Sequence, residues 1–315
     1  MSFDGELLEI CTSDGKGTPK QPIERATLLV DHGIDGDGHA GPGHRQVSAL
    51  ADESIQRMQK ALPDIVWGAF AENLVTQGVD WTQVAIGRRF RIGSDAVLQV
   101  TQRGKVCHNR CAIYYATGDC IMPTEGMFFV VRKGGEIVPG DRITTDPELD
   151  RLRFATITVS DRSSAGQRED LSGPTMIEVV NGGLDAVHVA HETVPDVKAR
   201  IAAVMRRMCE TQVVDVILTS GGTGLAPRDV TPEATRDVID REIPGIAEAI
   251  RAAGLAKTPH AMLSRAICGH RGRTLIVNLS GSPKAVTEQI ETLLPTLPHA
   301  VATVSGVPQD CARTD

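Results

Sequence analysis

The chain has 315 residues, of which 41% are hydrophobic, and it carries a formal net charge of -7 at pH 7. Lys and Arg are scattered through an acidic chain, which argues against a nucleic-acid partner, and no apolar run reaches the roughly 18 residues of a membrane-spanning helix. We therefore expect a cytoplasmic protein that binds small molecules, with no membrane or nucleic-acid partner. Its length exceeds that of one ordinary domain, so two domains are expected.

The texture of the sequence changes near residue 146, which predicts an N-terminal domain over residues 1–147 and a C-terminal domain over 148–315. In the first domain, short apolar runs alternate with glycines. This rhythm predicts a mostly β barrel with one helix over about residues 48–62. The apolar runs lie at 26–30, 97–101, 127–131 and 136–143.

In the second domain, apolar strand patterns alternate with longer helical patterns. Strands are predicted over 154–159, 186–193, 213–218 and 275–279. Helices are predicted over 173–181, 196–209, 232–239, 245–254 and 284–297. This alternation predicts a three-layer α/β/α domain with a mostly parallel sheet.

Three polar loops follow predicted strands of the second domain. They are Ser160-Asp-Arg162, Thr219-Ser-Gly-Gly-Thr-Gly224 and Asn278-Leu-Ser-Gly-Ser-Pro-Lys284. Because ligands of a parallel sheet bind at the carboxyl ends of its strands, we expect the loops to converge on one crevice. Glycine amides at 219–224 suit a nucleotide or pterin phosphate; the alternative is a simple chain reversal. Neither GxGxxG nor GxxxxGK[ST] is present.

Two carboxylates, Asp196 and Asp229, occupy loop positions near the expected crevice. Phosphate chemistry on a nucleotide requires a divalent cation, and Mg²⁺ takes one or two carboxylates together with substrate oxygens. The alternative for Asp196 is a helix N-cap, and for Asp229 a capping contact ahead of Thr231-Pro-Glu233.

The N-terminal half contains the segment Gly33-Ile-Asp-Gly-Asp-Gly-His-Ala-Gly41, followed by His44 and Arg45. A calcium loop is excluded because no Glu stands in the required twelfth position. Two interpretations remain: an anion-binding loop that uses His39, His44 and Arg45, or a glycine-rich β connection with solvated charges.

Seven cysteines, an odd number in a long chain, argue against a disulfide framework. Cationic neighbours can lower the pKa of Cys107 and make it a persulfide-carrying nucleophile. A zinc site is the rival hypothesis, although the spacing lacks the usual CxxC pair. Its ligands would be Cys107, His108, Cys111 and Cys120. For Cys111 and Cys120, buried structural thiols are a further alternative.

Residues 156–306 resemble the MogA/MoaB family of molybdopterin adenylyltransferases, whose fold is shared with domains of gephyrin and plant Cnx proteins. The motifs are Val159-Ser-Asp-Arg162, Ser172-Gly-Pro174, Thr219–Gly224, Arg228-Asp-Val-Thr-Pro-Glu233, Ile243-Pro-Gly245, Leu263-Ser-Arg265 and Asn278–Lys284. The resemblance implies that the terminal phosphate of molybdopterin attacks Mg-ATP. It also implies that the family's trimeric or hexameric assembly is to be expected.

The same resemblance assigns the site residues. Asp196 and Asp229 are implied to be catalytic, holding a transient Mg²⁺ or positioning the phosphates. Nucleotide and pterin are implied to bind at the glycine loop and the flanking strand ends. The residues concerned are Ser160, Asp161, Thr219, Ser220, Gly221, Gly222, Thr223, Gly224, Ser280, Gly281 and Pro283.

Residues 5–145 resemble the MOSC domain of molybdenum cofactor sulfurases and related proteins. The motifs are Gly33–Arg45, Gly68-Ala-Phe-Ala-Glu-Asn-Leu74, the Cys107 segment and Gly134-Gly-Glu-Ile-Val-Pro-Gly-Asp141. The family's characteristic cysteine falls on Cys107, which is implied to carry sulfur or to meet the cofactor's metal. Any sulfur must come from a separate donor, because no pyridoxal-phosphate desulfurase domain is present.

Together, the two resemblances indicate a bifunctional protein of molybdenum cofactor biosynthesis, with possible handover to a MoeA-type metal-insertion protein. Two alternatives stay open: a molybdopterin carrier or storage protein without turnover, and a MOSC sulfurtransferase with a MoaB-like binding domain. The sequence does not distinguish molybdenum from tungsten.

Overall fold

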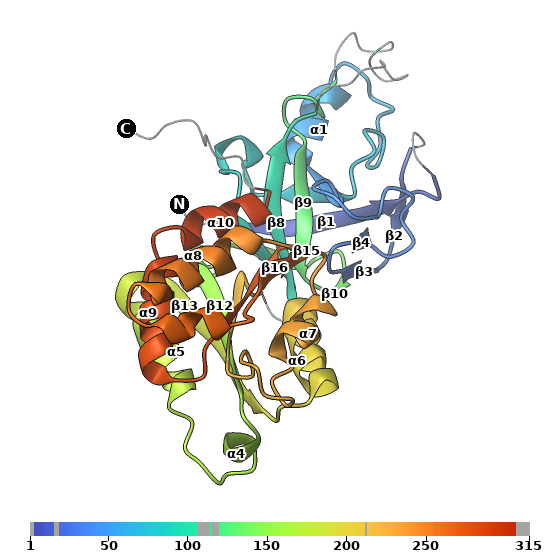
Figure 1. The fold of residues 1–315 in the computed structure, drawn as a ribbon. Coiled ribbons are helices and arrows are strands. Elements are labelled where there is room, and N and C mark those ends of the chain that lie inside the picture. Colours follow the sequence, from blue (N-terminus) through green and yellow to red (C-terminus); the bar gives the residue numbers. More distant parts are fainter. Residues whose placement is uncertain (1–2, 16–18, 106–113, 115–119, 212, 307–315) are drawn as a thin grey trace, which may run out of the picture. The chain divides into compact units, whose positions relative to one another are not determined.

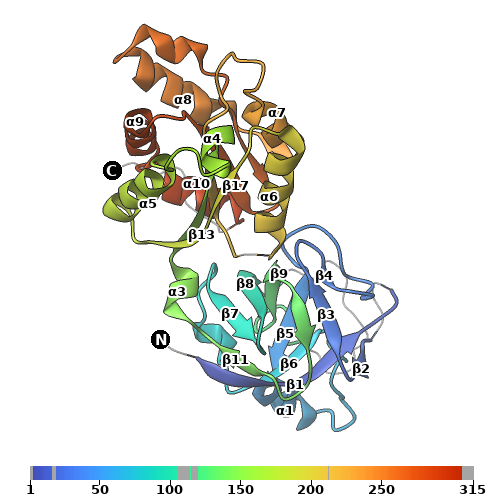
Figure 2. The same cartoon turned by 90° about the horizontal axis from the view of Figure 1, so that it is seen from below.

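A computed structural model describes residues 3–15, 19–105, 114, 120–211 and 213–306. The chain divides into two compact units, Met1–Asp150 and Arg151–Asp315, and each is described by itself. Figures 1 and 2 show the β-rich first unit and the layered second unit.

The first unit is built on a closed seven-stranded barrel, which confirms the predicted mostly β barrel. The barrel runs β11-β7-β8-β9-β5-β6-β1 and closes through antiparallel pairing of β1 with β11. Closure leaves no free edge within this ring, because both edge strands are paired. The strands are β1 (Asp4–Thr12), β5 (Val47–Ala51), β6 (Leu74–Gln77), β7 (Arg89–Ile92), β8 (Ala96–Arg103), β9 (Met127–Lys133) and β11 (Arg142–Thr144).

Smaller elements surround the barrel. Strand β2 (Gln21–Ile23) pairs with β1, and β3 (Ala26–Leu29), β4 (Gly33–Ile34) and β10 (Gly135–Ile137) form a separate sheet. The helical pieces are α1 (Asp52–Gln59), η1 (Trp81–Gln83) and α3 (Pro147–Asp150). In the core, Trp81 makes edge contacts with Phe90 and Phe129, with ring centroids 5.1 and 5.2 Å apart.

The helix expected over residues 48–62 is corrected by the structure. Residues Val47–Ala51 form strand β5 instead, and the helix α1 is confined to Asp52–Gln59. Of the five strand residues only Val47 favours a strand by residue type, but all five are buried, between β6 on one side and β9 on the other. Tertiary pairing therefore overrides the local preference of Ala and Leu for helix.

A buried carboxyl in the first unit gives a testable pH dependence. Glu72 is fully buried, and burial raises its pKa from 4.5 to about 7, against hydrogen bonds from the amides of Gly68 and Phe70. Between these pH values the folded state keeps the proton that the unfolded chain releases. Stability should therefore fall as pH rises from about 4.5 to 7, by about 3 kcal/mol.

The matching variant is Glu72→Gln. Its side chain keeps one oxygen that can accept a hydrogen bond from a backbone amide, and it cannot ionise. Denaturant unfolding of both proteins from pH 4.5 to 8 should show a difference in unfolding free energy that shifts in favour of the variant as pH rises. Parallel pH profiles would contradict the expected proton uptake at Glu72.

The second unit is a six-stranded sheet between two helical layers, which confirms the predicted α/β/α class. The sheet order is β13-β12-β14-β17-β16-β15. The first four strands are parallel: β13 (Ala186–Val194), β12 (Leu152–Val159), β14 (Val216–Ser220) and β17 (Thr274–Leu279). Strand β16 (Cys268–Arg271) pairs antiparallel with β17, and β15 (Arg241–Glu242) pairs antiparallel with β16.

Successive residues of a strand point to opposite faces of the sheet and so pack against different helical layers. Val216 and Leu218 of β14 join one apolar cluster, and Ile217 between them joins the other. Helices α5 (Ser172–Gly183), α8 (Pro244–Leu255), α9 (Pro283–Leu293) and α10 (Leu297–Val304) pack in the first cluster. Helices α6 (Lys198–Thr211) and α7 (Thr231–Arg236) pack in the second.

One predicted helix is split. The pattern over 284–297 continues as two helices, α9 and α10, because Pro295 lies between them and lacks the amide hydrogen that a continuous helix requires. Two short pieces, α4 (Asp161–Ser164) and η2 (Pro259–Leu263), complete the unit. Among the helices of the described residues, none combines the length and apolar character that a membrane crossing requires.

Candidate functional site

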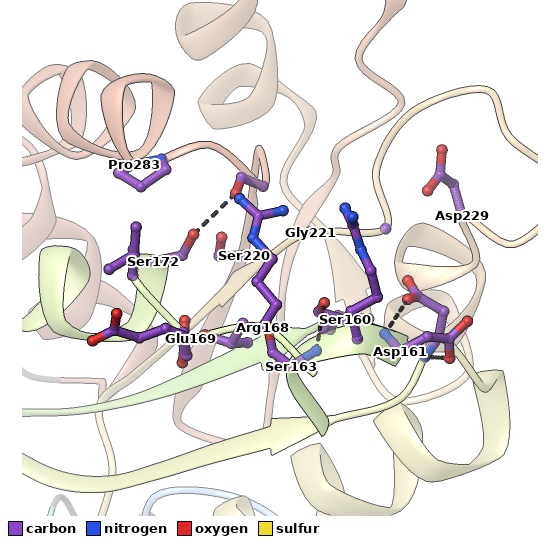
Figure 3. A pocket seen from close by; sticks show the side chains of 18 residues that line it. Ser160, Asp161, Ser163, Arg168, Glu169, Ser172, Ser220, Gly221, Asp229 and Pro283 are labelled. Atoms are coloured by element: carbon purple, nitrogen blue, oxygen red, sulfur yellow. Dashed lines mark hydrogen bonds between the residues drawn. The ribbon is translucent and has the colours of Figure 1, made fainter. Parts of the chain in front are cut away.

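The carboxyl ends of the parallel strands enclose one polar cavity of about 410 Å³ (Figure 3). All three loops predicted to converge contribute to it, together with Asp196 and Asp229. The lining residues are Thr158–Ser163, Arg168–Ser172, Asp196, Ser220–Gly222, Asp229, Gly281 and Pro283. The three strand-end loops therefore lie around one cavity, as expected from the sequence.

The glycine loop approaches its neighbours so closely that side chains would not fit. Gly221 has φ +101°, and a Cβ there would lie 2.3 Å from the carbonyl oxygen of Val159. Gly222 has φ +63°, and its Cβ would lie 2.4 Å from Oγ1 of Thr231. Both positions require glycine, for conformation and for space. The loop is thus a bare backbone wall of the cavity.

Hydroxyl groups tie the strand-end loops together. Ser220 Oγ donates to the carbonyl oxygen of Ser280 at 2.9 Å, and Ser172 Oγ donates to that of Gly281 at 2.9 Å. These bonds hold the last loop against both the glycine loop and the start of α5. The cavity wall is therefore fixed before any ligand binds.

Asp161 and Asp196 hold each other in a reciprocal arrangement. The amide of Asp161 donates to Oδ2 of Asp196 at 2.8 Å, and the amide of Asp196 donates to Oδ1 of Asp161 at 3.0 Å. Arg228 donates to both carboxylate oxygens of Asp161 and lowers its pKa. The pKa of Asp196 is raised, first by burial and then by the negative charges of Asp161 and Asp229. A cation at this place would relieve that unfavourable charge.

Asp229 is placed by its own loop. Its Oδ2 accepts from the amide of Ala226 at 2.9 Å, and a Cβ on Gly224 would lie 2.8 Å from the same oxygen. The carboxylate therefore lies beside the glycine loop, and helix α7 has Val230 rather than Asp229 as its N-cap. The carboxylate of Asp196 likewise accepts from another loop, at Asp161.

Arg265 supports this region from behind. Its side chain donates to the carbonyl oxygens of Gly224 at 2.7 Å and Asp229 at 2.5 Å, and it pairs with Glu233. Pairing with Arg265 also lowers the pKa of Glu233. One guanidinium group thus links the glycine loop to the acidic loop.

The predicted binding residues separate into two groups. Ser160, Asp161, Ser220, Gly221, Gly222, Gly281 and Pro283 line the cavity with Asp196 and Asp229. Four others do not. Thr219 is fully buried and accepts from Nδ2 of Asn278 at 3.0 Å, Thr223 and Gly224 accept from Arg265, and Ser280 lines a neighbouring cavity of about 250 Å³.

The sequence interpretation missed the loop that forms the far wall. Residues 168–171 line the cavity and were assigned no role, although they immediately precede the Ser172-Gly-Pro174 motif. Asp170 accepts from the amide of Gly173 at 3.0 Å and contacts His191 Nε2 at 2.9 Å. A run of charged residues without glycine gave no signal of a ligand loop.

Cys107 and its neighbours His108 and Cys111 lie outside the described residues, so the persulfide and zinc hypotheses stay predictions. Of the described thiols, burial raises the pKa of Cys11 and of Cys268 to about 12. Cys209 is buried and Cys120 is partly buried. No group of three or more His, Cys, Asp or Glu side chains in the described part of the chain is placed to hold a metal ion.

The glycine-rich segment of the first unit is held by a buried ion pair. Lys20 Nζ lies 2.5 and 2.7 Å from the two carboxylate oxygens of Asp37, and both side chains are almost fully buried. Nearby, His44 contacts Gln102 at 3.0 Å and the guanidinium of Arg45 lies over the ring of Phe128. The anion-loop hypothesis stays a prediction.

Residues 155–299 match the family described as the probable molybdopterin binding domain, and residues 35–144 match the MOSC domain. A molybdopterin adenylyltransferase of Helicobacter pylori is 37% identical over 159 residues, covering 50% of this chain and 90% of that protein. The molybdenum cofactor synthesis protein cinnamon of Drosophila melanogaster is 40% identical over 153 residues. That match covers 49% of this chain and 26% of cinnamon. The crystal structure of MoaB from Thermus thermophilus is 50% identical, covers 50% of this chain and 99% of that one, and has a TM-score of 0.48.

These findings define the chain as a two-domain protein with a barrel unit and an α/β/α unit. It belongs to the molybdopterin adenylyltransferase family through its C-terminal half, to which an N-terminal MOSC domain is fused. Its place in molybdenum cofactor biosynthesis follows from that membership.

Proposed function

We propose that the C-terminal unit is a Mg-ATP-dependent molybdopterin adenylyltransferase. The observation that carries the proposal is that Asp196 and Asp229 meet a bare glycine loop in one cavity. The names of the relatives at 37 to 40% identity support the same reaction.

In the proposed reaction, an oxygen of molybdopterin's terminal phosphate forms a bond to the α-phosphorus of ATP. The bond between that phosphorus and the α–β bridging oxygen breaks, and pyrophosphate leaves with the electron pair. Such chemistry depends on positioning and on charge stabilisation more than on covalent steps by the protein. The Ser220–Gly222 backbone would orient the phosphates with little reorganisation, because the loop is already held in place, in part by the Gly221 amide, which donates to the carbonyl oxygen of Leu279 at 3.2 Å.

The donor set fits a magnesium ion that arrives with its nucleotide. One oxygen of each carboxylate accepts from a backbone amide, and the other has no hydrogen-bond partner among the described residues. Mg²⁺ is typically bound by one or two carboxylates plus phosphate oxygens and water. When bound, the ion would neutralise phosphate charge, while Asp196 and Asp229 would hold it beside the glycine loop.

The N-terminal unit is proposed to bind the pterin cofactor or to carry sulfur on Cys107. This rests on the MOSC match and on the sequence, and a persulfide mass increment on Cys107 would be its direct sign. Fusion of the two units suits the transfer of one pterin between two sites. We further propose that the enzyme is a trimer or hexamer and is cytoplasmic. Its product would pass to a metal-insertion protein.

The test is release of pyrophosphate from ATP by the full-length chain. We expect release only when molybdopterin and Mg²⁺ are both present, with adenylylated molybdopterin as the second product. The competing carrier hypothesis expects molybdopterin to bind without pyrophosphate release. Binding without turnover, under conditions where a known family member turns over, would contradict the proposal.

A further inference from the structure

The loop between Ser160 and Ser172 presents two arginines to the candidate site. Arg162 and Arg168 both line the cavity and both are exposed. Within the described parts of the chain, neither guanidinium group has a hydrogen-bond or ion-pair partner. Figure 3 shows the Arg168 side chain extending into the cavity toward Ser220.

The backbone that carries these arginines is fixed at both ends. At its start, the amide of Ser163 donates to Ser160 Oγ, and the amide of Gln167 donates to the carbonyl oxygen of Arg162 at 2.9 Å. At its end, Asp170 is held by Gly173 and His191. The loop is therefore anchored, while the two cationic side chains are free to take a ligand.

The charge balance of the cavity identifies what these arginines would bind. Five carboxylates line the cavity, against two guanidinium groups, and one of the five, Asp161, is already paired with Arg228, which is not among the lining residues. Those carboxylates are Asp161, Glu169, Asp170, Asp196 and Asp229. A polyphosphate entering such a site meets net repulsion unless cations oppose it. Magnesium between Asp196 and Asp229 would serve one end of the phosphate chain, and the arginine loop would serve the other.

We infer that Arg162 and Arg168 form a clamp for the β- and γ-phosphates of the nucleotide, and so for the pyrophosphate leaving group. The inference rests on the proposed adenylyl transfer and adds its leaving-group site. The α-phosphate would lie by Ser220–Gly222 and the two acids, and the pyrophosphate would extend toward the arginine loop. Guanidinium groups suit this role because their planar donors match phosphate oxygens in pairs.

The experiment measures binding of inorganic pyrophosphate to the full-length chain by calorimetry in the presence of Mg²⁺, without molybdopterin. The double variant Arg162→Gln/Arg168→Gln should weaken pyrophosphate binding at least tenfold, since a charge-assisted hydrogen bond contributes that much or more. AMP binding should change less than threefold, because AMP lacks the β- and γ-phosphates. The variant Arg162→Gln/Arg168→Lys, which keeps one positive charge, should bind pyrophosphate more tightly than the double glutamine variant and less tightly than the wild type. The control is Arg241→Gln, which removes the same charge from β15 at the opposite edge of the sheet.

The outcomes separate the inference from the proposed function. Unchanged pyrophosphate affinity in the double variant, or equal losses for AMP and pyrophosphate, would overturn the clamp even if the wild type adenylylates molybdopterin. Absence of pyrophosphate binding by the wild type would overturn it as well. Arginine-dependent pyrophosphate binding in a protein without turnover would uphold the clamp and refute the adenylyltransferase proposal.

Discussion

Replacing Asp196 by Asn is expected to abolish most adenylyl transfer without unfolding the C-terminal unit. The carboxylate lies in the cavity beside Gly222, whose Cβ would be 3.2 Å from its Oδ1. Removing the charge that would hold magnesium should lower kcat by about 10²- to 10³-fold, as for the loss of one preorganised electrostatic group. The asparagine oxygen can still accept from the amide of Asp161, so the local structure should persist.

Stability should move in the opposite direction from activity. Because the folded-state pKa of Asp196 is raised, the ionised carboxylate is disfavoured in the fold, and neutralising it at pH 7 removes that cost. We expect an equal or higher Tm for Asp196→Asn, measured alongside pyrophosphate release. The control Asp185→Asn alters an aspartate whose side chain is 82% exposed and lies outside the cavity, and it should leave kcat unchanged. Wild-type turnover by Asp196→Asn would show that this carboxylate is not catalytic.

Most of the C-terminal architecture was predictable because its main strands and helices are long and have a clear hydrophobic period. Strand residues 275–277, for example, read Leu-Ile-Val and are all apolar, as expected for a sheet covered on both faces. The antiparallel strands β15 and β16 were not predicted. They are two and four residues long, and the Cys268–Arg271 strand includes glycine, histidine and arginine, so it has no alternating apolar pattern.

The candidate site was predictable where geometry follows from topology, and hidden where it follows from side-chain pairing. Carboxyl ends of adjacent parallel strands must meet, so Ser160, Ser220 and Gly281 could be placed together from sequence alone. Arg265 belongs to the Leu263-Ser-Arg265 motif, but it lies more than 30 residues from Asp229, and the motif alone does not show that the two are in contact. Arg168 belongs to a charged loop that reads as an ordinary solvated turn.

The second large effect is expected in the first unit, from Lys20→Met. Lysine side chains are mostly exposed in folded proteins, yet the side chain of Lys20 is 1% exposed and its partner Asp37 is fully buried. Burial alone would raise the pKa of Asp37, but hydrogen bonds from Lys20 and from the Ser13 amide, with the charge of Lys20, lower it. Removing Lys20 leaves a buried carboxylate without its counter-ion, which typically costs about 3–5 kcal/mol.

The cost should depend on pH and on the partner. Without Lys20, the pKa of Asp37 should rise, so the stability deficit should be smaller at pH 4 than at pH 7, where the buried carboxylate would be charged. Adding Asp37→Asn removes that charge and keeps an oxygen for the Ser13 amide, so the double variant should be more stable than Lys20→Met alone. Urea unfolding of the single variants and the double variant gives the coupling energy. If the two residues interact, the second substitution should cost less once the first partner is gone, and the losses should not add. Additive losses would contradict this and would mean that each residue contributes independently, for example through packing.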